Sequence, residues 1–151
     1  MIAIDDLESH EFKQFLYLFQ HASRHVDIVS QALEAPLFQH AVFIDALTTL
    51  ARRGRHSRIR ILIADLGRAQ RRGHVLLRLH ERMPTALHIR VLEEASGHHP
   101  TTFVIDGGVA LSLQERLARI YRHERGEARR RQLRFEQLWH GARIPEELRQ
   151  L

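Results

Sequence analysis

The alternation of short apolar segments with segments of helical periodicity is the feature that most constrains the fold of this chain. The segment RIRILIAD (58–65) is the clearest of the apolar ones, and its β-branched residues predict a buried strand. Further strands are predicted at 25–33, 86–94, 101–106 and 108–113. Strands of this kind, separated by helices, are typical of an α/β fold.

Helices are predicted between these strands, at 8–22, 36–53, 76–83 and 127–140. The first of them has the clearest pattern, in which apolar residues recur at i, i+3, i+4 and i+7 as Phe12, Phe15, Leu16 and Phe19. Continuous apolar strands indicate burial on both sides. We therefore expect a mixed, mostly parallel sheet with helices on both faces.

The last two predicted strands, 101–106 and 108–113, are too close together for a helical crossover, so this part of the sheet is expected to be antiparallel. No linker composition interrupts the chain, and residues 1–151 are interpreted as one domain.

The composition is that of a globular protein, with 44% hydrophobic residues among 151. Absence of cysteine excludes disulfides and thiolate metal sites, which fits a reducing compartment. The first residues are acidic where a secretory signal needs positive charge, and no apolar run is long enough to span a membrane. We expect a soluble, cytoplasmic protein.

The positive charge of the chain comes almost entirely from arginine. The chain has 23 Lys plus Arg against 18 Asp plus Glu, and Lys13 is the only lysine. Arginines cluster at 52–60, 68–72 and 129–134. Such stripes can follow a phosphate backbone, or they can be solvated faces paired with nearby glutamates. With a net charge of only +5, weak and non-specific nucleic-acid binding is the most that we expect.

The segment GHHPTTFVIDGG (97–108) places His99 seven residues before Asp106. One interpretation is the remnant of a catalytic motif. The other is a loop histidine followed by a strand and a turn, because Asp-Gly is common in turns. The residues alone leave both interpretations open.

Several segments resemble the phospholipase D-like superfamily. ALTTLARRGRHSRIRILIAD (46–65) resembles the helix, Arg-Gly turn and strand that open the core of these domains, and FEQLWHGA (135–142) resembles the segment that closes it. The segments 74–90 and 145–151 resemble a single-repeat bacterial branch of unknown function, sometimes fused to GNAT-type acetyltransferases.

The segment 98–108 stands where the superfamily carries its H-x-K-x-x-x-x-D motif. His99 and Asp106 match the histidine and the aspartate, whereas Thr101 takes the place of the lysine. The superfamily's Gly-Ser-x-Asn element is absent, and ALSLQER (110–116) stands in its place. The resemblance therefore implies a degenerate motif.

In active members of the superfamily, two such motifs meet at one site, and a histidine attacks a phosphodiester to form a phosphohistidine. The lysines hold the phosphate and neutralise the charge of the transition state. Thr101 brings no positive charge. Loss of one preorganised donor costs about 3 kcal/mol, or roughly 100-fold in rate, so efficient phosphodiesterase chemistry is not expected.

The resemblance leaves three functional hypotheses. The first is a non-catalytic module that binds a phosphate-bearing ligand or a protein partner; the second is a weak or altered phosphodiesterase with His99 as nucleophile. The third is a structural or dimerisation domain. A single-repeat chain recovers the paired arrangement of the superfamily only as a C2 homodimer, in which two copies of His99 approach each other.

The resemblance makes His99 and Asp106 vestigial catalytic candidates, and candidate ligand-binding residues together with Thr101 and Asp65. Asp65 ends the strand 58–65 and is expected either to line a pocket at the carboxyl ends of the strands or to cap the next helix.

His21 and His25 have i, i+4 spacing but lack a third ligand, so they are interpreted as exposed or capping residues. No metal and no cofactor are expected.

Overall fold

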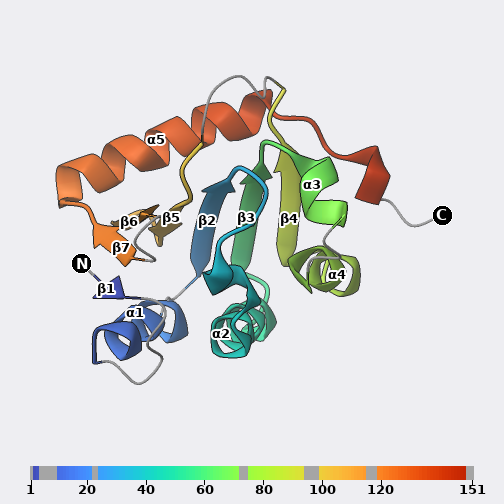
Figure 1. Ribbon diagram of the computed structural model, residues 1–151. Helices are drawn as coiled ribbons and strands as arrows, with labels where there is room; N and C mark the ends of the chain where they lie inside the picture. Colours follow the sequence, from blue (N-terminus) through green and yellow to red (C-terminus); the bar gives the residue numbers. More distant parts are fainter. Residues whose placement is uncertain are drawn as a thin grey trace.

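The computed structural model describes residues 2–3, 10–21, 24–71, 75–93, 99–114 and 119–148 (Figure 1). The helices are α1 (His10–Gln20), α2 (Ala41–Arg52), α3 (Leu66–Arg71), α4 (Val75–Arg82) and α5 (Arg125–Gly141), with the 3-10 helices η1 (Pro36–Gln39) and η3 (Glu146–Leu148). The strands are β1 (Ile2–Ala3), β2 (His25–Ser30), β3 (Arg58–Ile63), β4 (Leu87–Val91), β5 (Thr102–Ile105), β6 (Val109–Gln114) and β7 (Arg119–Arg122). No described helix is both long and apolar enough to cross a membrane.

All described strands form one mixed sheet, in the order β1-β7-β6-β5-β2-β3-β4. The expected α/β class and the mixed sheet are confirmed. The expectation that most strand pairings are parallel is wrong, because only the β2–β3 and β3–β4 pairings in the described sheet are parallel. The other four pairings of the described strands are antiparallel. For β5 and β6 the reason is the short turn between them, which cannot hold a crossover helix.

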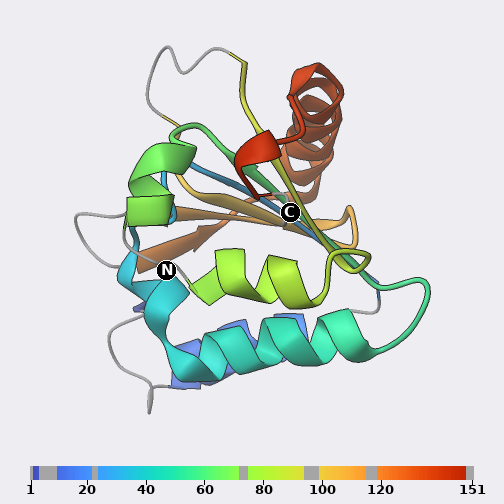
Figure 2. The same cartoon turned by 90° about the vertical axis from the view of Figure 1, so that its right-hand side faces the viewer.

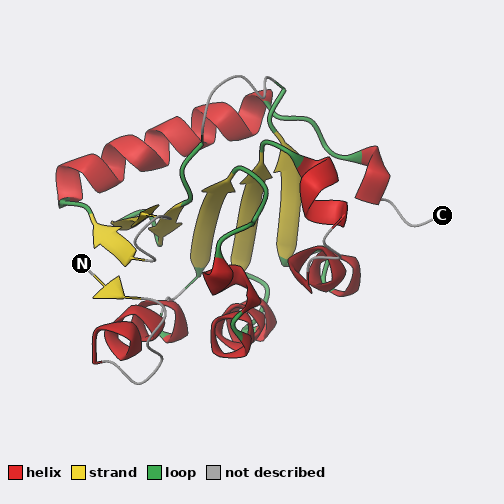
Figure 3. Cartoon of the chain, in the orientation of Figure 1, coloured by secondary structure: helices red, strands yellow, loops and turns green. Residues whose placement is uncertain are grey.

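Helices cover both faces of the sheet, as expected. Figures 1 and 2 show α1, α2 and α4 on one face and α5 on the other. Figure 3 shows that the two faces are covered unequally, because the long helix α5 is the main cover on its side.

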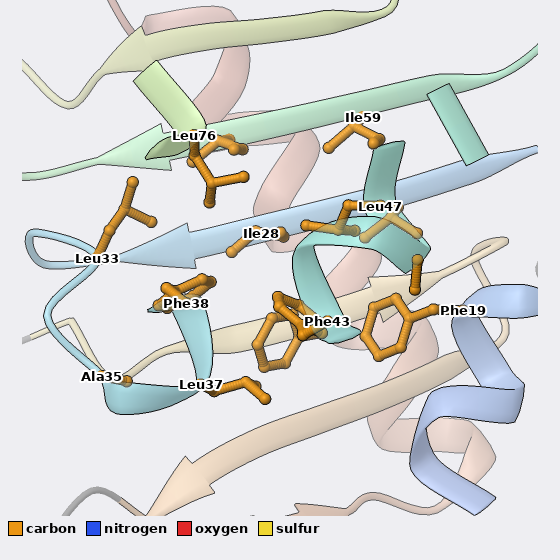
Figure 4. Close-up of a cluster of buried hydrophobic side chains, with 14 of the residues drawn as sticks. Phe19, Ile28, Leu33, Ala35, Leu37, Phe38, Phe43, Leu47, Ile59 and Leu76 are labelled. Atoms are coloured by element: carbon orange, nitrogen blue, oxygen red, sulfur yellow. The ribbon is translucent and has the colours of Figure 1, made fainter. Parts of the chain in front are cut away.

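The apolar core lies between the sheet and the α1/α2/α4 layer (Figure 4). Its centre is a group of fully buried phenylalanines from both layers: Phe15, Phe19, Phe38, Phe43 and Phe103. Their rings pack mostly edge to face, with centroids 4.9 to 6.3 Å apart. Removal of one such ring typically costs about 3–5 kcal/mol, so this face supplies most of the stability.

The face of the sheet toward α5 is more polar. Asp27 on β2 and Arg60 on β3 alternate with residues that point into the apolar core, so they lie beneath α5 instead. The apolar clusters on this face are small, and in one of them Phe135 and Trp139 of α5 pack with Leu62 of β3. The helix α5 is therefore held on the sheet by charged as well as apolar contacts.

Local differences from the expected elements have simple causes. The helix expected at 36–53 is two helices, because His40 is extended (φ −72°, ψ 121°) and separates η1 from α2. The short helix α3 and the strands β1 and β7 were not predicted; each has six residues or fewer, too few to show a period.

Candidate functional site

The pairing of β5 with β2 determines where the two ends of the predicted motif lie. Val26 is paired with Ile105 and Val29 with Thr102, so β5 runs antiparallel to β2. His99, which precedes β5, therefore lies near the carboxyl ends of β2, β3 and β4. Asp106, which follows β5, lies at their amino ends. The structure thus separates the two residues that the motif joins.

His99 is held by backbone contacts at the carboxyl edge. Its backbone N–H donates to Oε1 of Gln31 at 3.2 Å. The backbone carbonyl of Gln31 in turn accepts the N–H of Asp65 at 2.7 Å. The ring atom Nε2 of His99 is buried and has no hydrogen-bond partner among the described residues. A buried ring nitrogen without a hydrogen-bond partner is uncommon and calls for an explanation.

Thr101, at the lysine position of the motif, lies in the core. Its side chain is fully buried, and its Oγ1 is 3.1 Å from Oγ of Ser30. The Ser30 hydroxyl also accepts the backbone N–H of Leu33 at 3.1 Å. Thr101 therefore joins the end of β2 to the start of β5 and has no access to solvent.

The carboxylate of Asp106 binds backbone groups of a neighbouring strand. Its Oδ1 accepts the backbone N–H groups of Arg24 and His25, at 3.0 and 2.9 Å, at the beginning of β2. Its backbone is left-handed (φ 51°), a conformation that Asp tolerates better than most residues, and Gly107 follows with φ 71°. The carboxylate contacts therefore join the turn between β5 and β6 to the start of β2, and the N–H of Gly108 closes the turn by donating to the carbonyl of Ile105 at 3.0 Å.

Asp65 also makes local contacts. Its Oδ1 accepts the backbone N–H of Arg68 at 3.1 Å, at the start of α3. Asp65 is not among the residues that line the cavity beside His99. Of the two roles expected for Asp65, helix capping is the one that its contacts match.

A cavity of about 170 Å³ lies beside His99, between the sheet and α5. Its apolar walls come from β2, from β5 and the segment just before it, and from α5: Val29, Pro100, Val104, Phe135 and Leu138. Its polar groups are His99, Thr102, Arg131 and Arg134. The arginines were expected to form only an exposed stripe, and the cavity was missed because it needs α5 to lie over β5. The sole hint in the sequence is the helical spacing of 131, 134, 135 and 138.

The two cavity arginines differ in how firmly they are engaged. Nε of Arg131 is 3.2 Å from Oε1 of Glu127, which makes an ion pair on the surface of α5. Arg134 is exposed and has no ion-pair partner among the described residues. The cavity therefore offers a cation that no carboxylate neutralises, next to an unpaired histidine nitrogen.

A buried ionic network fixes α5 above the sheet and so positions the cavity arginines. Arg60 donates to both carboxylate oxygens of Asp27, from Nε at 2.8 Å and from a terminal nitrogen at 3.0 Å. It also donates to Glu136 on α5, and Gln132 bridges the two carboxylates at 3.2 and 3.1 Å. The guanidinium lies over the Phe135 ring, 4.9 Å from its centroid.

The network shifts the pKa values of Arg60 and Glu136 toward their charged forms. Burial opposes the charge of Arg60, but its hydrogen bonds to Asp27 and Glu136 outweigh burial and raise its pKa. The hydrogen bond from Arg60 lowers the pKa of Glu136 in turn. The charged groups of the network are paired with one another beneath α5, whereas Oε1 of Gln132 is buried and has no hydrogen-bond partner among the described residues.

No second histidine or lysine lines the cavity, so a second group able to protonate a leaving oxygen is missing from this part of the described structure. The described residues also contain no group of three metal-ligating side chains. His21 instead packs on the ring of Tyr17, with centroids 3.8 Å apart. The cavity of one chain therefore combines a single histidine with two arginines.

The arrangement of strands and helices is similar to that of solved phospholipase D-type structures. Nuc from Salmonella typhimurium, a phospholipase D family member, is 13% identical over 89% of this chain and 90% of its own, with a TM-score of 0.62. NucT from Helicobacter pylori is 10% identical over 88% of this chain and 89% of its own, with a TM-score of 0.65.

A third similar structure is the phosphatidylserine synthase from Haemophilus influenzae Rd KW20. It is 15% identical over 95% of this chain, with a TM-score of 0.64. The chain spans only 39% of the length of that protein. No curated protein matches the sequence.

These similarities confirm the expected fold, which is that of the phospholipase D-like superfamily. Residues 8–151 match the model of the Domain of unknown function (DUF7931), and the chain belongs to that family.

Proposed function

We propose that this protein is a non-catalytic phospholipase D-like module that holds a phosphate-bearing ligand in the cavity beside His99. One observation carries the proposal: the unpaired Nε2 of His99 and the unneutralised Arg134 belong to the same cavity. Charge-assisted hydrogen bonds from such groups are the ordinary means of binding phosphate. The apolar walls suit a ligand whose phosphate is attached to an apolar group.

The position of Thr101 argues against catalysis. A lysine at this site in the superfamily contacts the phosphate, whereas Thr101 is fully buried and bonded to Ser30. The module therefore keeps a histidine near its ligand but lacks the cation that stabilises the transition state. Asp106 and Asp65 contribute by holding the flanking loops, and we do not place them on the ligand.

Calorimetric titration with phenyl phosphate tests the binding proposal. We expect the wild-type protein to bind phenyl phosphate, and His99→Ala and Arg134→Ala each to weaken it by about 10-fold, the effect of losing one charge-assisted hydrogen bond. The matched control is Arg129→Ala, since Arg129 is exposed on the same helix and lines no part of the cavity. Absence of binding, or equal affinities in all variants, would refute the proposal.

The alternative of a weak phosphodiesterase is separated by an activity assay. We expect no hydrolysis of bis-p-nitrophenyl phosphate, nucleic acid or phospholipid. Turnover by the wild-type protein that disappears in His99→Ala would replace the non-catalytic proposal by the enzymatic one.

We also propose that the module forms a C2 homodimer, as expected for a chain that resembles half of a two-repeat protein. In such a dimer the carboxyl edges of the two sheets face each other, and the two copies of His99 approach across the axis. The cavity would then lie beside the interface and could be completed by it.

A further inference from the structure

A second surface, at the opposite edge of the sheet from His99, is rich in positive charge. A hollow of about 350 Å³ lies at the amino ends of β2 and β3. Its charged residues are Arg24, Arg55 and Arg58, accompanied by His25 and His56. No aspartate or glutamate lines it. Together with a second hollow that adjoins it, this hollow forms the amino-edge groove.

The adjoining hollow, of about 530 Å³, continues the groove toward β4. It is lined by Arg52 and Arg82 and shares Arg55, Ser57 and Thr85 with the first hollow. It too lacks a carboxylate. The groove therefore crosses the amino ends of three adjacent parallel strands and brings together arginines from the ends of α2 and α4, from the start of β3 and from the loops before β2 and β3.

The charges of the groove are not neutralised internally. Arg24, Arg55 and Arg58 have no ion-pair partner within the described ranges, and the buried Nε–H of Arg58 has no hydrogen-bond partner there. The carboxylate of Asp106 lies at the margin, where it accepts two backbone N–H groups. Burial, together with the charge of Arg58, lowers the pKa of His25, as expected where positive charge accumulates.

Helix dipoles explain only part of this accumulation. Arg52 and Arg82 lie in the last turns of α2 and α4, where a cation stabilises the helix end. Arg24, Arg55 and Arg58 lie outside helices and satisfy no such requirement. Their grouping needs another explanation, and binding of an external anion supplies one.

We infer that the amino-edge groove binds the phosphate backbone of nucleic acid and does so without reading the bases. Arginine suits this ligand because its planar guanidinium donates two hydrogen bonds to one phosphate. The groove is an open surface, which suits a polymer that passes along it. No phenylalanine, tyrosine or tryptophan lines either hollow, so the large aromatic rings on which successive bases usually stack are missing from the groove.

The dimensions of the groove limit the number of phosphates. Adjacent strands are about 4.8 Å apart, so the amino ends of three strands span about 10 Å. That length accommodates about two or three consecutive phosphates. The logarithm of the binding constant should therefore fall with the logarithm of salt concentration with a slope of about −2 to −3.

Fluorescence anisotropy with a labelled oligonucleotide of about 20 residues, over about 50 to 300 mM NaCl, tests the inference. We expect a dissociation constant near 10–100 μM at the lower salt and equal affinities for two unrelated sequences. Arg24→Glu/Arg55→Glu should weaken binding by about 10-fold or more.

The matched control is Arg125→Glu/Arg129→Glu, which changes the net charge equally at exposed positions on α5. It should weaken binding by about 3-fold or less, since only long-range charge is lost. Equal weakening by both pairs, no effect of the groove pair, or no wild-type binding at the lower salt would overturn the inference. So would a preference of one sequence over the other by about 10-fold.

Two further measurements keep the result interpretable. Melting curves should show that the groove pair is folded; if it is not, Arg24→Gln/Arg55→Gln replaces it, with an expected loss of about 5-fold. Saturating phenyl phosphate, at matched ionic strength, should leave the oligonucleotide affinity unchanged. Displacement of the oligonucleotide would move its site to the cavity beside His99 and overturn the inference.

Discussion

Asp27 and Arg60 lie directly opposite each other on the parallel strands β2 and β3 and form a buried, two-point ion pair beneath α5. Both residues are at most 5% exposed. Charges removed from water are costly unless they are fully paired, and here Glu136 and Gln132 complete the pairing. The pair thus couples the sheet to the helix that carries the cavity arginines.

Removal of Asp27 should destabilise the protein strongly. Asp27→Ala leaves the buried guanidinium of Arg60 with Glu136 alone, and we expect a loss of about 3 kcal/mol in the free energy of unfolding, measured by urea denaturation. Asp27→Leu/Arg60→Met, which removes both charges, should lose much less. As a control, Arg143→Gln breaks an exposed pair with Glu147 and should leave the urea midpoint unchanged. An Asp27→Ala midpoint equal to that of the control would contradict this prediction.

Asp106 should act on stability and leave ligand binding intact. Asp106→Ala removes the acceptor of two backbone N–H groups and places alanine at φ 51°, so we expect a loss of about 1–2 kcal/mol by urea denaturation. Asp106→Asn keeps one acceptor oxygen and tolerates the left-handed backbone, and should lose less than half as much. If phenyl phosphate affinity falls along with stability in both variants, Asp106 belongs to the binding site after all.

Thr101→Lys, which restores the residue that the motif lacks, should not restore activity. The side chain at 101 is fully buried, and a buried ammonium without a partner should cost several kcal/mol, about 3 or more. Thr101→Val, of nearly the same size, should lose only about 1 kcal/mol with the Ser30 contact. Thermal melts give the comparison, and phosphodiesterase turnover in a folded T101K variant would be incompatible with this account.

Acid should destabilise the protein in two stages. Burial lowers the pKa values of His25, His88 and His123 below 6.5 in the folded protein. Below about pH 6.5 the unfolded chain therefore binds more protons than the folded one, and the free energy of unfolding falls as pH falls. The hydrogen bond from Arg60 lowers the pKa of Glu136, so a second decline follows below pH 4.5.

Urea midpoints measured from about pH 8 to pH 3 separate the stages. His88→Gln/His123→Gln should flatten the first decline and leave the second. His10→Gln, at an exposed position on α1, is the control and should change neither. A first decline of undiminished size in the double variant would place its origin elsewhere.

Light scattering over a concentration series tests the proposed homodimer. We expect the mass of two chains at high concentration, because a self-complementary patch is used twice. A monomer throughout the series would exclude it. A dimer in which spin labels beside the two His99 positions are far apart would exclude the carboxyl-edge arrangement and leave the fold untouched.

The sequence predicted the elements with strong periodicity and missed what depends on their assembly. The phenylalanines at 12, 15 and 19 located α1 because their spacing is a property of one helix. The Asp27–Arg60 pair could not be predicted, since its two residues meet only through the β2–β3 register. Gln31 was likewise unremarkable in the sequence, and its contact with His99 depends on the order of strands in the sheet.

The seven-residue step from His99 to Asp106 spans the sheet along the strand direction, from the carboxyl end of β2 to its amino end. The strand β5 contributes four residues, or about 13 Å at the usual rise, and a residue or two at each end reaches the loops on either edge. Each of the two residues makes its own contact there. The backbone N–H of His99 donates to Gln31, and the carboxylate of Asp106 accepts a backbone N–H just before β2. The length of β5 therefore sets the spacing of the two residues, and this spacing does not depend on which residue occupies position 101.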